Sequence, residues 1–208
     1  MGHSTGSIEM KKLGITARHY NLAAALVLLL PAILSAATDK NIDAKKSVLI
    51  IHVGKAGMFS AAGHAHWVDA PISHGQFNEG AAAHVEFSVD AGKMIVRADE
   101  KTSAKDRAKI QETMQTAVLD SEKYPEIRFR STTVTPLGGQ AWKVAGALTL
   151  HGVSKVVSVE VRRDGETYAG SGRIKQTDFG IEPVTIGGGV VKVKDELEIS
   201  FRIYSAGK

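Results

Sequence analysis

The stretch that decides the fold is residues 142–161, WKVAGALTLHGVSKVVSVEV. From Trp142 to Leu150, a residue suited to an apolar face occupies every second position, and polar residues or alanine lie between them. The alternation resumes after His151-Gly152, with valine at positions 157, 159 and 161. Successive side chains of a strand point to opposite faces of a sheet. Each half of the stretch therefore predicts an antiparallel strand with one apolar and one wet face.

The same period of two recurs on both sides of this stretch. It is clear in residues 85–89, 127–130 and 197–203, and residues 48–53, VLIIHV, form a further β-rich run. Turn signals separate the runs, and the strongest is Asp164-Gly165, a pair typical of two-residue hairpins. About eight short strands without helical crossovers predict an all-β fold, either a sandwich or a closed barrel.

Residues 103–119, SAKDRAKIQETMQTAVL, break this pattern and predict one amphipathic helix. The segment contains neither glycine nor proline. Four apolar residues in it fall on a single helical face, namely Ile110, Met114, Ala117 and Val118. Ser103 with Asp106 three residues later resembles a capping box, with Asp in place of the usual Glu.

The first 37 residues have the organisation of a secretory leader. Residues 22–37, LAAALVLLLPAILSAA, form an uncharged apolar run that follows basic residues and precedes a polar segment. A basic region, a short apolar region and a small-residue end describe a signal peptide. We therefore expect a start at Met10, cleavage after Ala37 and one exported mature domain, residues 38–208. The alternative is an uncleaved anchor, although the run is shorter than the ~20 residues that span a bilayer.

The composition of the mature region argues against several classes of protein. It holds 23 basic and 21 acidic residues, a net charge of about +2, and no basic run interleaved with aromatic residues, so nucleic-acid binding is not predicted. The chain has no cysteine, which excludes disulfides, thiol catalysis and zinc–thiolate sites. It also lacks the G-x-S-x-G motif of serine hydrolases. A hydrolase is therefore only a residual hypothesis.

His64 and His66 stand out within SAAGHAHWVDAP, residues 60–71. Side chains two apart on a strand share a side, and two neutral imidazoles are suitable zinc or copper ligands. Four residues could supply a third ligand: Asp69, His52, His74 and His151. Such a pair also arises by chance among the six histidines of the mature region. The alternative is that the two side chains hydrogen-bond the backbone near the rim of a barrel.

Apolar and aromatic side chains from different strands form the more informative set. They would either fill a packed core or line an apolar cavity, since ligand pockets are mostly apolar with a few placed polar groups. An eight-stranded barrel is wide enough to hold one small ligand. The candidate lining residues are Phe59, Phe87, Phe129, Trp142, Leu148, Leu150, Val159, Phe179 and Phe201.

Several segments resemble the YceI family of exported polyisoprenoid-binding proteins. They are residues 50–75, LDSEKYPEIRFRSTTV (119–134), VAGALTLHGVSKVVSVEV (144–161), TDFGI (177–181) and KDELEISFRI (194–203). The resemblance covers about residues 45–204, and its most specific part is Tyr124-Pro125-Glu126-Ile127 combined with LTLHGV at 148–153. The Gly63-His64-Ala65-His66 element departs from the common pattern and indicates a subgroup.

The resemblance implies an eight-stranded, lipocalin-like antiparallel barrel with the helix at about 103–119 inserted. Its tunnel would hold a polyisoprenoid or an isoprenoid quinone, with no catalysis and no required cofactor. The partner would be this lipid, and transient contact with a membrane or a membrane redox protein fits the role. The protein would be a monomer or a homodimer.

Two hypotheses about the histidines follow. His64, His66 and His151 would meet a headgroup at the tunnel mouth, because imidazoles donate hydrogen bonds to carbonyl oxygens. The competing hypothesis is a metal-binding module on the same barrel that uses His64 and His66.

Overall fold

The computed structural model describes residues 1–3, 38–56, 65–186 and 191–207. Three predictions fall outside these residues: the leader with its cleavage point after Ala37, the lining residue Phe59, and His64. The described residues from 38 onward belong to one compact unit, Ala36–Lys208. The described segments include no helix that is both long and apolar enough to cross a membrane.

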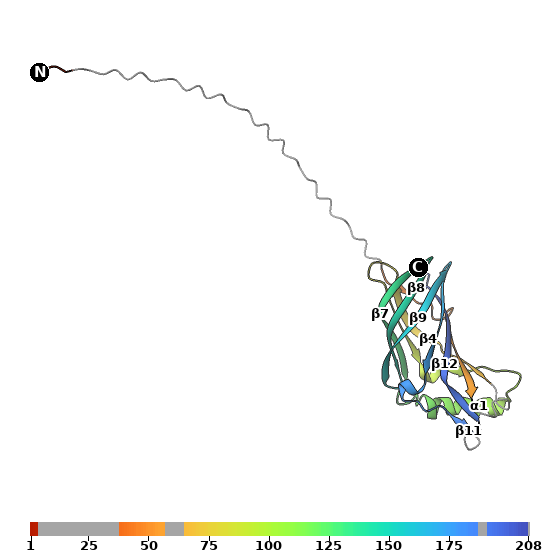
Figure 1. The fold of residues 1–208 in the computed structure, drawn as a ribbon. Helices are drawn as coiled ribbons and strands as arrows, with labels where there is room; N and C mark the ends of the chain where they lie inside the picture. The colour runs from red at the N-terminus through yellow and green to blue at the C-terminus, as the bar shows by residue number, and fades with distance from the viewer. Residues whose placement is uncertain (4–37, 57–64, 187–190, 208) are drawn as a thin grey trace. The chain divides into compact units, whose positions relative to one another are not determined.

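One curled antiparallel sheet makes up most of this unit (Figure 1). Its strands follow the order β1-β4-β5-β7-β8-β9-β10-β12-β2-β3-β6, and β11 pairs with β12. The predicted all-β class and antiparallel, barrel-like architecture are confirmed. The strands are β1 (Lys40–Asn41), β2 (Val48–Ala56), β3 (His66–Asp69), β4 (Ile72–Asn78), β5 (His84–Asp90), β6 (Ile95–Val96), β7 (Glu126–Gly138), β8 (Ala141–Leu150), β9 (Val153–Asp164), β10 (Thr167–Lys175), β11 (Thr185–Ile186) and β12 (Val191–Tyr204).

The predicted number of eight strands differs from the twelve of the described sheet. Eight of these twelve strands have seven or more residues, so the number of long strands equals the number predicted. The other four, β1, β3, β6 and β11, have only two to four residues. Segments this short contain too few positions for alternation to reveal them.

Residues 142–161 form strands β8 and β9, as the alternation predicts. Val144, Leu148 and Leu150 are buried on one face of β8, whereas Lys143 on the other face is exposed. A two-residue turn joins β8 to β9 at His151-Gly152, with φ of 52° and 74°. Two successive positive φ values are typical of the hairpin turn that matches the twist of antiparallel strands.

The sheet is joined back to itself near β1. Ile42, just after β1, donates its backbone N–H to the carbonyl of Gly75 in β4 at 2.8 Å. On its other side, Asp43 donates to the carbonyl of Tyr204, and Ala206 donates to that of Asn41, both at 2.8 Å. The segment around β1 therefore bridges β4 and the end of β12, two strands that are far apart in the order of the sheet.

The helix lies at the opposite end from β1 and the C-terminus (Figure 1). It consists of α1 (Ala104–Thr113) and a π-helical continuation, η3 (Met114–Val118). Ser103 caps it, accepting a hydrogen bond from the backbone N–H of Asp106 at 3.1 Å, so the predicted helix and its cap are confirmed. Ala117, expected on the apolar face, is exposed instead. A π-helical turn holds more residues than an α-helical turn, so the residues in this part of the helix are rotated about its axis away from the positions that α-helical spacing predicts.

Two glutamines attach the helix to the sheet. The side chain of Gln111 accepts from the N–H of Val96 in β6 and donates to the carbonyl of Met94, both at 2.8 Å. Gln115 donates to the carbonyl of Met94 at 3.1 Å and to that of Ala91 at 3.0 Å. Ala91 begins η2 (Ala91–Lys93), the short helical turn that follows β5. The helix thus spans the gap between the edge strand β6 and the end of β5.

Gly146 makes room for an aromatic ring on the concave face of the sheet. A Cβ at this position would lie 2.7 Å from Cζ of Phe129 and 2.4 Å from the carbonyl oxygen of Arg130. Gly170 has the same relation to Phe201, at 2.5 Å from its Cζ. Each phenylalanine ring therefore lies across a glycine of the neighbouring strand, a pairing in which the aromatic side chain covers an otherwise bare backbone.

We predict that Gly146→Ala destabilises the protein by about 1–3 kcal/mol, the usual cost of overpacking a filled site. The new methyl group meets backbone atoms of β7, which cannot move aside without disturbing the ladder between β7 and β8. Thermal and urea unfolding would measure the change. Gly207→Ala is the matched control, because a Cβ there has no atom within 4 Å. Equal stability of the two variants would contradict the prediction.

Candidate functional site

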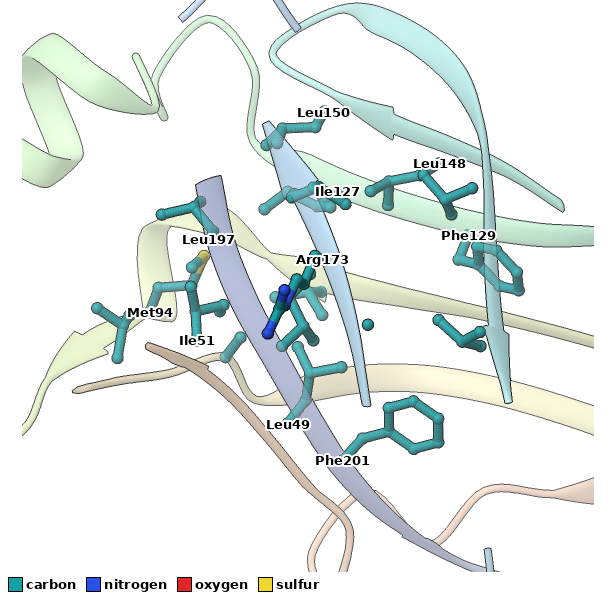
Figure 2. Close-up of a pocket in the computed structure, with 18 of the residues that line it drawn as sticks. Leu49, Ile51, Met94, Ile127, Phe129, Leu148, Leu150, Arg173, Leu197 and Phe201 are labelled. Atoms are coloured by element: carbon teal, nitrogen blue, oxygen red, sulfur yellow. The ribbon is translucent and has the colours of Figure 1, made fainter. Parts of the chain in front are cut away.

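The concave face of the sheet surrounds a cavity of about 980 Å³. This is close to the upper limit of ligand pockets, about 300–1,000 Å³. Figure 2 shows side chains that line it from strands on different sides of the barrel, including Leu49 and Ile51 of β2, Leu148 and Leu150 of β8, and Phe201 of β12. The cavity is lined along its length, from Glu79 near β1 to residues of α1. The concave apolar face is therefore not completely filled by its own side chains.

Most of the predicted lining residues face this cavity. Seven of them line it: Phe87, Phe129, Trp142, Leu148, Leu150, Val159 and Phe201. Phe87 and Phe129 also contact each other, with ring centroids 5.5 Å apart. Phe179 is not among the lining residues; it lies on η4 (Thr177–Phe179), a short turn of 3-10 helix, and is buried there. Phe59 lies outside the described residues.

The cavity also has walls that the sequence prediction missed. β2 contributes Leu49, Ile51 and Val53, and α1 and η3 contribute Ile110, Met114 and Val118. The sequence did contain a sign of each wall. The β-rich run at 48–53 corresponds to β2, and the apolar face of the predicted helix corresponds to α1 and η3. The missing information was that the helix covers the end of the barrel, which places its apolar face against the cavity.

A polar cluster lies beside the cavity near β1. The carboxylate of Glu79 accepts a hydrogen bond from the Tyr168 hydroxyl, one from Lys40 at 2.6 Å and one from Arg163 at 3.3 Å. Partial burial alone would raise the pKa of Glu79, but hydrogen bonds from Lys40 and Tyr168 and the two positive charges outweigh it and lower the pKa. Burial, aided by Glu79, raises the pKa of the Tyr168 phenol. Within this cluster Glu79 is thus an ionised carboxylate matched by two cations.

Lys55 and His66 lie at the other end of the cavity, near the helix. His66 pairs with Val53 across β2 and β3, so both side chains lie on the concave face. Lys55, two residues beyond Val53, lies on the same face and lines the cavity, as His66 does. The Nδ1 of His66 is 3.9 Å from a carboxylate oxygen of Asp99. The pKa of Asp99 is lowered, first by a hydrogen bond from Thr102 and to a smaller extent by His66.

The other histidines named by the sequence occupy different places. His151 packs on Tyr124, with ring centroids 4.4 Å apart, and does not line the cavity. His52 stacks on Trp67 at 4.3 Å, and Trp67 is 46% exposed. Of the three predicted headgroup histidines, His66 is therefore the one that faces the cavity among the described residues, since His64 is outside them.

The metal hypothesis gains no support from the described part of the chain. No group of three or more histidine, aspartate or glutamate side chains there is placed to hold a metal ion. Asp69, a suggested third ligand, instead accepts hydrogen bonds from Nε and Nη2 of Arg97. The exposed His74 contacts the hydroxyl of Ser73 at 3.3 Å. Within the described ranges, Asp69 and His74 are therefore engaged with side chains other than His66.

Comparison with known proteins gives one family. The model of the YceI-like domain matches residues 41–204. A UPF0312 protein of Pseudomonas savastanoi is 36% identical over 93 residues, which are 40% of this chain and 46% of that protein. A UPF0312 protein of Vibrio cholerae is 29% identical over 121 residues, 52% of this chain and 64% of that protein. The alignments thus cover about half to two thirds of the length of these curated relatives.

Solved structures with the same fold are more distant in sequence. The crystal structure of Burkholderia cenocepacia BcnA has a TM-score of 0.55 at 21% identity and covers 80% of this chain and 99% of that one. A polyisoprenoid binding domain from Saccharophagus degradans, described as implicated in plant cell wall breakdown, has a TM-score of 0.57 at 14% identity, with coverage of 83% and 99%. At these identities the two structures establish the shared fold.

We predict that Ile199→Phe lowers the affinity of the cavity for a neutral apolar fluorophore, N-phenyl-1-naphthylamine. Ile199 lines the cavity, so a larger side chain would grow into free space instead of overpacking the core. The fluorescence titration should show several-fold weaker binding, while the melting temperature changes little. Val156→Phe is the control, because Val156 is 75% exposed and does not line the cavity. Unchanged binding by Ile199→Phe would show that the fluorophore binds elsewhere.

Proposed function

This chain belongs to the YceI-like domain family, and we propose on that premise that it binds one long apolar lipid in the cavity of its barrel. The lipid is a polyisoprenoid or an isoprenoid quinone, and the protein carries or sequesters it without chemical change. The support from related proteins is the similarity in fold to the polyisoprenoid binding domain from Saccharophagus degradans.

The observation that carries this proposal is the apolar cavity of about 980 Å³. Its wall consists of aliphatic and aromatic side chains along the strands, and the charged groups lie near its ends. Moving an apolar chain from water into such a space is favourable by about 25 cal/mol for each Å² of apolar surface buried. A long isoprenoid exposes several hundred Å² of this kind, so binding requires a cavity of suitable shape and no catalytic residue.

The proposed binding site has low specificity for the structure of the lipid tail. Hydrophobic burial is not directional, and its free energy grows with the area that is buried. Tails of different length would therefore differ in affinity mainly through the surface they bury. Discrimination between lipids would come from the polar groups near the ends of the cavity.

We predict that the protein purified from its native host carries an isoprenoid lipid. Native mass spectrometry should detect one bound lipid for each chain, and organic extraction followed by mass spectrometry of the extract should identify it. The protein freed of lipid should then bind a long-chain isoprenoid quinone, with an increase in melting temperature because the ligand binds the folded state. A protein that is repeatedly empty and also fails to bind the quinone would refute the proposal.

We further propose that the protein works in the periplasm or outside the cell after removal of its leader. The basis is the basic, apolar and small-residue order of residues 10–37, which is that of a signal peptide. The mature protein should begin at Thr38, as determined by N-terminal sequencing of the protein from a periplasmic extract. Replacing Lys11 and Lys12 by glutamate should retain the precursor in the cytoplasm. A chain that keeps residues 10–37 in the cell envelope would instead indicate an anchor.

A further inference from the structure

We propose that the β1 end of the cavity holds the headgroup of the lipid, and that Glu79 selects a headgroup that donates a hydrogen bond. The chemical class is an aromatic hydroxyl, as in a prenylated hydroquinone, and the corresponding quinone binds more weakly. This inference rests on the proposed lipid binding and adds the class and the place of the headgroup. It depends on three aromatic rings and on the partners of one carboxylate.

Three aromatic side chains gather at this end of the cavity. Phe77 of β4, Trp142 of β8 and Tyr168 of β10 all line it. The centroid of the Tyr168 ring is 4.9 Å from that of Phe77 and 6.3 Å from that of Trp142. Aromatic rings favour offset-stacked and edge-to-face contacts at such distances. A ring-shaped headgroup therefore finds suitable neighbours at this end.

Glu79 adds a carboxylate to the same part of the wall. It lies two residues beyond Phe77 and lines the cavity as Phe77 does. Its Oε1 accepts hydrogen bonds from Tyr168 and Arg163, and its Oε2 accepts one from Lys40. Burial raises the pKa of Glu79, but these partners outweigh burial and lower it, so the carboxylate is ionised at neutral pH. Because an ionised carboxylate offers about four acceptor positions, the three donors leave room for a further one.

Two other polar residues that line this end, Asn78 and His84, are directed toward protein acceptors. Asn78 donates from Nδ2 to Asp39 at 3.0 Å, and its Oδ1 accepts from the N–H of Gly80 at 2.7 Å. His84 contacts the carbonyl of Ala82 through Nδ1 at 2.9 Å and Asp39 through Nε2 at 3.5 Å. A ligand that reaches this end therefore meets an acceptor, the neighbouring carboxylate, more readily than a donor.

The ion pairs of this end balance one another, which favours a neutral headgroup. Glu79 pairs with Lys40 and Arg163, and Asp39 supplies the second negative charge. His84 adds a positive charge only when it is protonated. An anionic headgroup would be repelled by the Glu79 carboxylate, and a quinone would place acceptor oxygens against it. An aromatic hydroxyl is neutral and donates the hydrogen bond that the carboxylate can accept.

The test compares ligands that have the same geranylgeranyl tail on a hydroquinone, on the quinone and on the dimethyl ether of the hydroquinone. The protein freed of lipid is titrated with each under anaerobic conditions, which keep the hydroquinone reduced. We expect the hydroquinone to bind about tenfold more tightly than the other two, the effect of one hydrogen bond to a charged group. The dimethyl ether keeps the ring and lacks the donor, so it isolates the hydroxyl. Geranylgeraniol, with a hydroxyl and no ring, should also bind more weakly than the hydroquinone.

The variant Glu79→Gln should lower the preference to less than about threefold, because an amide can accept from a hydroxyl and can also donate to a quinone. The side chains of Lys40 and Arg163 are 44% and 37% exposed, so both cations stay hydrated without their anion. Retained binding of the dimethyl ether shows that the variant is folded. Glu86→Gln is the control, because Glu86 pairs with Arg130 at 2.8 Å and does not line the cavity. It should keep the full preference.

A crystal structure of the wild-type protein with the hydroquinone provides a measurement that does not depend on the variant. A hydroxyl oxygen should lie about 2.5–3.0 Å from a carboxylate oxygen of Glu79, the range of an O–H···O hydrogen bond. A headgroup at the helix end of the cavity would overturn the inference.

The titrations can overturn the inference in separate ways. If the hydroquinone and its dimethyl ether bind equally, or if Glu79→Gln keeps the full preference, the role of Glu79 is wrong. If geranylgeraniol binds as tightly as the hydroquinone, the aromatic class is wrong. In these cases the proposed lipid binding stands. If none of the four ligands binds, the proposed lipid binding itself fails, and the headgroup inference fails with it.

Discussion

The concave face of the sheet must bury its apolar side chains against one another, because the described chain supplies no second layer of strands to cover it. A single sheet can do so only if it curls far enough to bring strands that are distant in its order close together. The backbone hydrogen bonds that join residues 41–43 to β4 on one side and to the end of β12 on the other make this connection near β1. The rest of the structure depends on this curvature, since a flatter sheet would expose the same side chains to water.

The two ends of the barrel are closed in different ways. Near β1, the strands meet one another, and the polar groups there form a matched cluster around Glu79. At the helix end, α1 and η3 lie across the opening, held by the side chains of Gln111 and Gln115. One end is therefore closed by strand pairing and compensated charge. The other is covered by an element with partly buried apolar residues, beside which Lys55 and His66 face the cavity.

The sequence predicted the fold well wherever alternation was long. Strands β8, β9 and β12 were visible from their period of two, and the helix from its cap and apolar spacing. Two-residue strands such as β1 and β6 could not be predicted, because their pairing depends on the curvature of the whole sheet. The cavity was predicted only as one of two alternatives, since Phe87 or Leu148 would alternate in the same way in a filled core.

The individual site residues were harder to predict for a related reason. Alternation assigns a residue to a face, but it does not say how far along the barrel that residue lies. Phe179 was therefore placed in the wall although it belongs to a short helical turn. His151 was placed at the mouth although it packs on Tyr124. Lys55 was overlooked because the β-rich run was taken to end at Val53, whereas β2 continues to Ala56.

The attachment of the helix has a consequence for the kinetics of exchange. No residue of α1 or η3 is fully buried. Their apolar side chains are only partly buried against the core, and Gln111 and Gln115 donate side-chain hydrogen bonds to backbone carbonyls. Elements with few buried apolar contacts open at a lower free-energy cost than the strands they cover. A ligand could therefore enter and leave while every rung of the β-ladder stays intact. Residence time would then depend on this local opening, and affinity on the buried surface, so the two quantities could change independently.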